Sequence, residues 1–120
     1  EPTEIPARAC SCSFCIKHGG VWTSCPMGFL TVNFQDRARV SKYSFGTKTA
    51  DFHICMACGV VPVVTSEIDG HTYAVVNINA MEGIDPTMFK RASISFDGED
   101  EATRLARRAR GWISRVRFGD

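Results

Sequence analysis

The chain has 120 residues, 22% charged residues and a net charge of +1, which is the size of a single domain with one modest hydrophobic core. The near balance of charge excludes a strongly basic nucleic-acid-binding protein and an acidic tail. No apolar run approaches the roughly 20 residues of a membrane span, and no secretory signal precedes the cysteines. We therefore expect a cytoplasmic protein whose thiols stay reduced, with no membrane or nucleic-acid partner.

Short β-rich segments separated by turns are predicted along most of the chain. The N-terminal segment 1–9 contains two prolines and is expected to be extended or irregular. Alternating or β-branched residues predict strands over 21–25, 29–34, 40–45, 51–54, 60–65 and 73–78. Turns are expected at 19–20, 46–49 and Asp69-Gly70, and a short helix is expected to begin at Pro86, capped by Asp85.

The segment 97–118 is predicted to be an amphipathic helix, so that the domain is mainly β with a C-terminal helix. Apolar residues recur there every three or four positions: Ala102, Leu105, Ala106, Ala109, Trp112, Ile113 and Val116. Acidic residues precede the basic ones, as the helix dipole favours. The basic residues are interpreted as a solvated face, with a binding surface for a nucleic acid or an acidic partner as the alternative. They include Arg104, Arg107, Arg108 and Arg110.

Six cysteines are the unusual feature of the composition. Five lie in two clusters, Cys10-x-Cys12-x-x-Cys15 and Cys55-x-x-Cys58. A disulfide framework spreads its cysteines between distant loops, whereas thiolates that converge on one ion at about 2.3 Å suit such close spacing. The clusters therefore predict zinc as the cofactor, and the isolated Cys25 is predicted to be a free thiol buried in a strand.

Four segments resemble one family in both order and spacing. They are the first cysteine cluster with Gly19 four residues after it, Tyr43–Thr49, Cys55–Gly59, and Val76–Asn79 with its continuation Met81–Asp85. Together they resemble the GFA family, which includes glutathione-dependent formaldehyde-activating enzymes and centromere protein V-like proteins. The resemblance covers about residues 8–90 of a single domain, 1–120, and leaves the C-terminal helix outside it.

The resemblance implies small antiparallel sheets of the zinc-bound β-tent type. It also implies a zinc-dependent carbon–sulfur lyase acting on a thiol–aldehyde adduct such as S-hydroxymethylglutathione, with a small thiol such as glutathione and an aldehyde as partners. In the family, Cys10, Cys12 and Cys15 would form the reactive three-thiolate site. Cys55 and Cys58 would match half of a closed four-thiolate site.

The other half of that closed site, an N-terminal Cys-x-Cys, is absent, because none of the nine residues before Cys10 is cysteine. Three arrangements remain open: one zinc shared by Cys55, Cys58 and two of the triplet; an open triplet site with the other pair empty; or no metal. A first strand is also expected to be missing, and the resulting exposed strand edges favour a homodimer.

Weaker candidates lie beside the motifs. Lys17 and His18 could meet a substrate carboxylate and Trp22 could form a pocket wall, while His53 either orients a ligand or lies on a strand surface.

The main alternative to the lyase is a non-catalytic, zinc-stabilised binding module that uses the basic C-terminal helix. A thiolate cluster facing a pocket favours the enzyme, whereas a closed four-coordinate zinc favours the module. A redox-active Cys-x-x-Cys protein is a third class, but the βαβ context of that motif is not visible.

Overall fold

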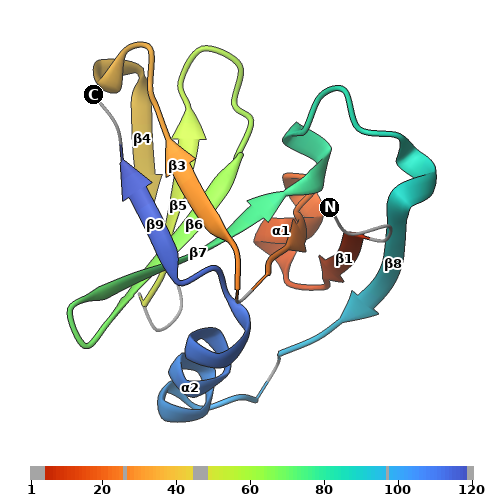
Figure 1. Ribbon diagram of the computed structural model, residues 1–120, viewed down its shortest axis with the longest axis vertical. Coiled ribbons are helices and arrows are strands. Elements are labelled where there is room, and N and C mark those ends of the chain that lie inside the picture. Colours follow the sequence, from red (N-terminus) through yellow and green to blue (C-terminus); the bar gives the residue numbers. More distant parts are fainter. Residues whose placement is uncertain (1–4, 26, 45–48, 97, 119–120) are drawn as a thin grey trace.

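The computed structural model describes residues 5–25, 27–44, 49–96 and 98–118, and they form a mainly β fold (Figure 1). The strands are β1 (Ile5–Cys10), β2 (Val21–Thr23), β3 (Phe29–Val32), β4 (Val40–Tyr43), β5 (Asp51–Cys55), β6 (Val63–Ile68), β7 (His71–Asn77), β8 (Phe89–Ile94) and β9 (Arg115–Phe118). The helices are α1 (Ser13–Lys17) and α2 (Glu101–Gly111), with 3-10 turns η1 (Arg37–Arg39), η2 (Ile78–Ala80) and η3 (Pro86–Met88). The mainly β prediction and all six predicted strands are confirmed, with small shifts in their bounds, whereas the predicted turn over 46–49 lies mostly outside the described residues.

Seven strands form one sheet in the order β4-β5-β6-β7-β2-β1-β8, and β3 pairs with β9 in a second sheet. Most pairs are antiparallel, as expected, but β1 with β8 and β3 with β9 are parallel. Parallel partners need a long crossover between them, and each of these pairs joins segments that are far apart in the sequence. The segment before Cys10, predicted to be extended or irregular, is extended: it is a strand from Ile5 onward, because β2 and β8 pair with it on its two sides.

The β6–β7 hairpin forms the centre of the large sheet. Its turn is the predicted Asp69-Gly70, where both residues have positive φ, 53° and 78°, as a two-residue hairpin turn requires. Residues 63–66 of β6 are all buried. Both faces of this strand are therefore covered by other parts of the protein.

The β3–β9 pair covers one face of the large sheet near β5 (Figure 1). The rings of Phe34 and Phe118 lie 6.3 Å and 5.8 Å from the ring of His53. His53 is only 5% exposed, and its Nε2 lies 2.8 Å from the hydroxyl of Thr65. The prediction that His53 lies on a strand surface is therefore wrong, because this second layer covers it. Burial also lowers the pKa of His53.

The predicted helix over 97–118 is shorter in the structure. It begins after Asp100, whose side chain accepts a hydrogen bond from the Thr103 amide, and it ends at Gly111. Ile113 then exchanges two backbone hydrogen bonds with Ala74 of β7, at 2.9 Å and 3.0 Å, and residues 115–118 become β9. Pairing with two distant strands thus overrides the helical period of the local sequence.

The opposite face of the large sheet holds the main apolar cluster. It includes Trp22, Val61, Val64, Val75 and the buried thiol Cys15. The first cysteine cluster therefore lies at the edge of the hydrophobic core. No helix among the described residues is long and apolar enough to cross a membrane.

Candidate metal centre

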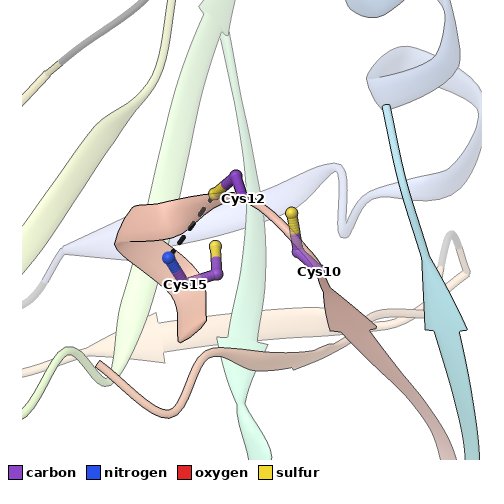
Figure 2. Close-up of side chains that lie close together, drawn as sticks. All are labelled: Cys10, Cys12 and Cys15. Atoms are coloured by element: carbon purple, nitrogen blue, oxygen red, sulfur yellow. Dashed lines mark hydrogen bonds between the residues drawn. The ribbon is translucent and has the colours of Figure 1, made fainter. Parts of the chain in front are cut away.

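A strand end and a single helical turn bring Cys10, Cys12 and Cys15 together. Cys10 is the last residue of β1, Cys12 is the N-cap of α1, and Cys15 lies in the first turn of α1. The Cys12 Sγ accepts a hydrogen bond from the Cys15 amide at 3.4 Å. Figure 2 shows the three sulfur atoms pointing into the same space, and all three lie within 4.8 Å of one another.

This geometry fits a metal ion. Sulfur ligands at about 2.3 Å around a tetrahedral ion lie about 3.8 Å apart, so small side-chain rotations within the observed 4.8 Å limit are sufficient. Three protein ligands leave a fourth position free for another ligand. The triplet can therefore hold a metal ion with an open coordination position.

The thiol of Cys15 is the most constrained of the three. Its hydrogen bond with Cys10 and its burial raise its pKa, and Cys12 adds to this effect, while the hydrogen bond from Trp22 opposes it. The indole Nε1 of Trp22 lies 3.4 Å from the Cys15 Sγ. Because an indole N–H can only donate, Trp22 stabilises the sulfur as an acceptor and hence as a thiolate.

Two asparagines, one at the end of β7 and one just after it, hold the segment that follows α1. The Asn77 side chain accepts hydrogen bonds from the amides of Val21 and Asn79 and donates one to the Val61 carbonyl, at 3.0–3.2 Å. The Asn79 side chain donates to the Gly19 carbonyl at 2.7 Å. These contacts join the exit of the cysteine turn to the centre of the sheet.

Gly20 makes a close approach that a larger residue would block. A Cβ atom at this position would lie 2.7 Å from the Trp22 ring and 3.1 Å from the Cys15 Cβ. We expect Gly20→Ala to lower the free energy of unfolding by about 1–3 kcal/mol, the usual cost of overpacking a core, and to weaken metal binding because Cys15 must move. Chemical denaturation and metal titration measure the two effects.

Gly111→Ala is the matched control for Gly20→Ala, because a Cβ at Gly111 would meet no atom within 4 Å. We expect this variant to retain both stability and metal affinity. Equal stability and equal metal affinity of the two alanine variants would contradict the close approach at Gly20.

The cysteine triplet opens into a cavity of about 250 Å³. Its apolar wall includes Trp22, Phe52, Val64, Val75 and Trp112. The Phe52 ring lies 6.1 Å from the Trp22 ring in an edge-on arrangement. The site is thus a concave, largely apolar pocket with sulfur ligands on one side, a typical arrangement for binding a small molecule.

Of the three predicted substrate-binding residues, the structure places only Trp22 on this cavity. Lys17 and His18 are exposed at the end of α1 and do not line it. The His18 ring stacks on Phe14 at 4.1 Å, and its Nδ1 lies 2.9 Å from the Phe14 carbonyl. These contacts hold the His18 ring against Phe14 of α1.

The second cluster forms a separate turn. Gly59 has φ of 81°, and its amide donates to the Cys55 carbonyl at 2.7 Å. Amides of Cys58 and Ala57 lower the pKa of Cys55 by hydrogen bonding to it. In the part of the chain that the structure describes, three or more metal-ligating side chains meet only at Cys10, Cys12 and Cys15. The arrangement with one ion shared between the two clusters is therefore wrong for this structure.

Cys25 differs from its prediction. It is exposed and lies beyond the end of β2 at Thr23, so it is not a thiol buried in a strand. The strand is shorter than predicted because β2 pairs through only two residues each with β1 and β7.

Four arginines on the cavity were missed as site residues. They are Arg8 of β1 and Arg104, Arg107 and Arg108 of α2. The helix arginines were interpreted as a solvated face, but Arg108 is only 8% exposed and the other two are half-buried. Helical periodicity gave no signal for them, because it assigns the alanines to the buried face.

Comparisons with known proteins identify no family for the chain. No protein-family model matches it, and no curated protein matches it. A crystal structure of a Rhodobacter sphaeroides protein is similar over 68% of this chain and 72% of that one, with 26% sequence identity and a TM-score of 0.48. A similarity of this size carries no argument about function.

Proposed function

We propose that the protein is a zinc-dependent carbon–sulfur lyase of the GFA type that acts on a thiol–aldehyde adduct. The observation that carries the proposal is that the cysteine triplet faces a cavity and has three ligands rather than four. A structural zinc site is closed by four protein ligands, whereas a reactive site keeps one position open. The resemblance of residues 8–90 to the GFA family, described above, points to the same chemistry.

A soft divalent ion such as zinc, when bound by three thiolates, would supply a position for the substrate sulfur. In the reaction, the carbon–sulfur bond of the hemithioacetal breaks with its electron pair passing to sulfur. The hydroxyl proton passes to water as the aldehyde C=O bond forms. The products are a thiolate, an aldehyde and a proton.

The chain's own residues would bind and orient the substrate. Trp22 fixes Cys15 through its indole hydrogen bond. The rings of Phe52 and Trp112 with Val64 and Val75 form an apolar wall that reduces the amount of water around the adduct. Excluding water strengthens the electrostatic contacts made inside the pocket. The non-catalytic module is less well supported, because it requires the helix arginines on an outer surface, whereas Arg104, Arg107 and Arg108 line the cavity.

Metal analysis combined with a turnover assay tests this function. We expect the Cys55→Ser/Cys58→Ser double variant, which leaves only the triplet, to bind one zinc per chain. X-ray absorption at the zinc edge should show three sulfur ligands and one light atom. Formaldehyde release from S-hydroxymethyl adducts should exceed the uncatalysed rate in the wild-type protein.

A closed site or an inactive protein would overturn the proposal. Four sulfur ligands in the double variant, or no zinc in freshly reduced wild-type protein, contradict an open zinc site. Rates equal to the uncatalysed reaction for all thiol adducts tested contradict the lyase activity even if zinc binds.

A further inference from the structure

The C-terminal helix presents its charged side to the protein interior. Arg108 is 8% exposed, while Ala102, Ala106 and Ala109 are exposed to solvent. Burying a guanidinium group is unfavourable unless an opposite charge and hydrogen bonds compensate for it. An orientation that buries arginine and exposes alanine is therefore expected where the arginine has a ligand to bind.

Few negative charges balance the arginines of the cavity. Arg104 and Arg107 both pair with Glu99, at 3.3 Å and 3.0 Å. Within residues 5–25, 27–44, 49–96 and 98–118, no carboxylate pairs with Arg8 or Arg108. The pKa of Arg8 is lowered by burial and by the nearby charge of Arg107. Burial and the charges of Arg107 and Arg104 lower the pKa of Arg108 to about 10. The guanidinium groups are thus close enough to repel one another.

Arg108 also has an unused hydrogen-bond donor. Its Nη1 donates to the Thr49 carbonyl, the Thr49 hydroxyl and the Ser66 hydroxyl at 2.9–3.3 Å. Its Nε is buried without a hydrogen-bond partner, and the ring of Trp112 lies 5.0 Å from the centre of the guanidinium group. An unpaired buried donor is costly. Three fixed contacts on Nη1 therefore hold the group in place. Within the described residues Nη2 makes no hydrogen bond, which leaves this donor for a ligand in the cavity that Arg108 lines.

Arg107 shows which ligand suits such a donor. Its Nε and Nη2 bind the two oxygens of Glu99, each at 3.0 Å. This planar, two-point contact is the preferred geometry between guanidinium and carboxylate. Arg8, on the facing strand, is held by a 2.7 Å hydrogen bond from its Nη2 to Ser24, and both arginines line the same cavity as the cysteine triplet.

We propose that Arg8 and Arg108 form a carboxylate subsite, and that the substrate thiol is a small thiol acid whose carboxylate binds there while its sulfur lies at Cys10, Cys12 and Cys15. The position of the sulfur rests on the proposed function, whereas the carboxylate subsite does not. A cavity of about 250 Å³ suits a small molecule. The subsite selects for negative charge as well as for sulfur, so thiols without an acidic group are poor ligands.

Calorimetric titration with two matched thiols tests the subsite. 3-Mercaptopropionate and its neutral amide differ only in the acidic group, and both are titrated anaerobically into zinc-loaded protein without added reductant. We expect the acid to bind at least tenfold more tightly than the amide, with a preference that falls as salt is added. In Arg8→Gln and in Arg108→Lys we expect the preference for the acid over the amide to fall below threefold. Arg108→Lys keeps the positive charge but loses the planar guanidinium group that binds a carboxylate at two points.

Arg110→Gln is the matched control, because Arg110 is an exposed residue of the same helix and does not line the cavity. It should retain the full preference for the acid. Equal affinity for acid and amide in the wild-type protein, no binding of either thiol, or an unchanged preference in both folded cavity variants would overturn the subsite. If the protein prefers the acid but shows no turnover, the carboxylate subsite stands and the lyase activity is rejected. If it shows turnover but no preference for the acid, the lyase activity stands and the subsite is rejected.

Discussion

Replacing Cys15 with serine is expected to remove metal from the triplet and to lower kcat/KM for the adduct by at least about 100-fold, because loss of even an outer-shell partner costs 10–100-fold. Cys15 is 4% exposed and is one of three sulfurs within 4.8 Å. A serine oxygen is a harder ligand that suits a soft ion poorly, and a two-thiolate site is incomplete. Zinc per chain, measured by mass spectrometry, and initial rates of aldehyde release measure the two effects.

Cys25→Ser provides the matched control for the Cys15 substitution. Cys25 is exposed and does not line the cavity, so we expect this variant to match the wild-type protein in zinc content and rate. Loss of activity in Cys15→Ser with full retention of zinc would show that the triplet is not the metal site. Full activity in Cys15→Ser would reject the triplet as the reactive centre.

The cysteine triplet could be predicted from the sequence because its geometry is local. One strand end and one helical turn determine where Cys10, Cys12 and Cys15 lie, and spacings of two and three residues suffice to bring their sulfurs together. The turn at Cys55–Gly59 is equally local, because a glycine directly after the pair can adopt the positive φ that the turn needs. Whether the two clusters share one ion depends on sheet topology, which spacing does not encode.

The arginine side of the cavity could not be predicted in the same way. Helical periodicity assigns buried positions by apolarity, but the apolar positions of α2 include Ala102, Ala106 and Ala109, which gain little free energy from burial. The orientation of the helix is instead set by contacts far away in the sequence. Arg108 binds Thr49 and Ser66, and Ile113 pairs with Ala74. A binding residue buried at the expense of local preference is expected at a functional site.

Neither β1 nor β9 was predicted as a strand, for a related reason. β1 contains one proline and one arginine and has no alternating pattern, and β9 continues the helical period of the preceding segment. Each becomes a strand because a parallel partner from the other end of the chain, or from β3, supplies the hydrogen bonds. Non-local pairing of this kind outweighs weak local propensity.

Asn77→Ala is expected to lower the free energy of unfolding by about 3 kcal/mol, since each buried backbone group left without a partner costs roughly 1–3 kcal/mol. Asn77 is 1% exposed, and its side chain serves the Val21 amide, the Asn79 amide and the Val61 carbonyl. Val21 starts the strand that follows the cysteine turn. Loss of this side chain therefore loosens the sheet and the metal centre together. Urea denaturation, monitored by tryptophan fluorescence, measures the change. The slope of the free energy of unfolding against urea concentration should be the same in both proteins.

Asn79→Ala is the control for Asn77→Ala. It shows how much stability is lost when an asparagine side chain outside the buried hydrogen-bond network is removed. The Asn79 side chain donates to the Gly19 carbonyl and is exposed. We therefore expect a loss below about 1 kcal/mol, as for a solvent-accessible hydrogen bond. Both variants are measured with and without zinc, because bound metal adds stability through mass action. A loss below about 1 kcal/mol for metal-free Asn77→Ala would contradict the inferred role of Asn77, since the Val21 amide and Val61 carbonyl would then have found other partners. We therefore expect Asn77→Ala to have a clearly lower free energy of unfolding than Asn79→Ala. We also expect zinc to raise the free energy of unfolding by less in Asn77→Ala, because the Asn77 side chain anchors the turn that carries Cys15.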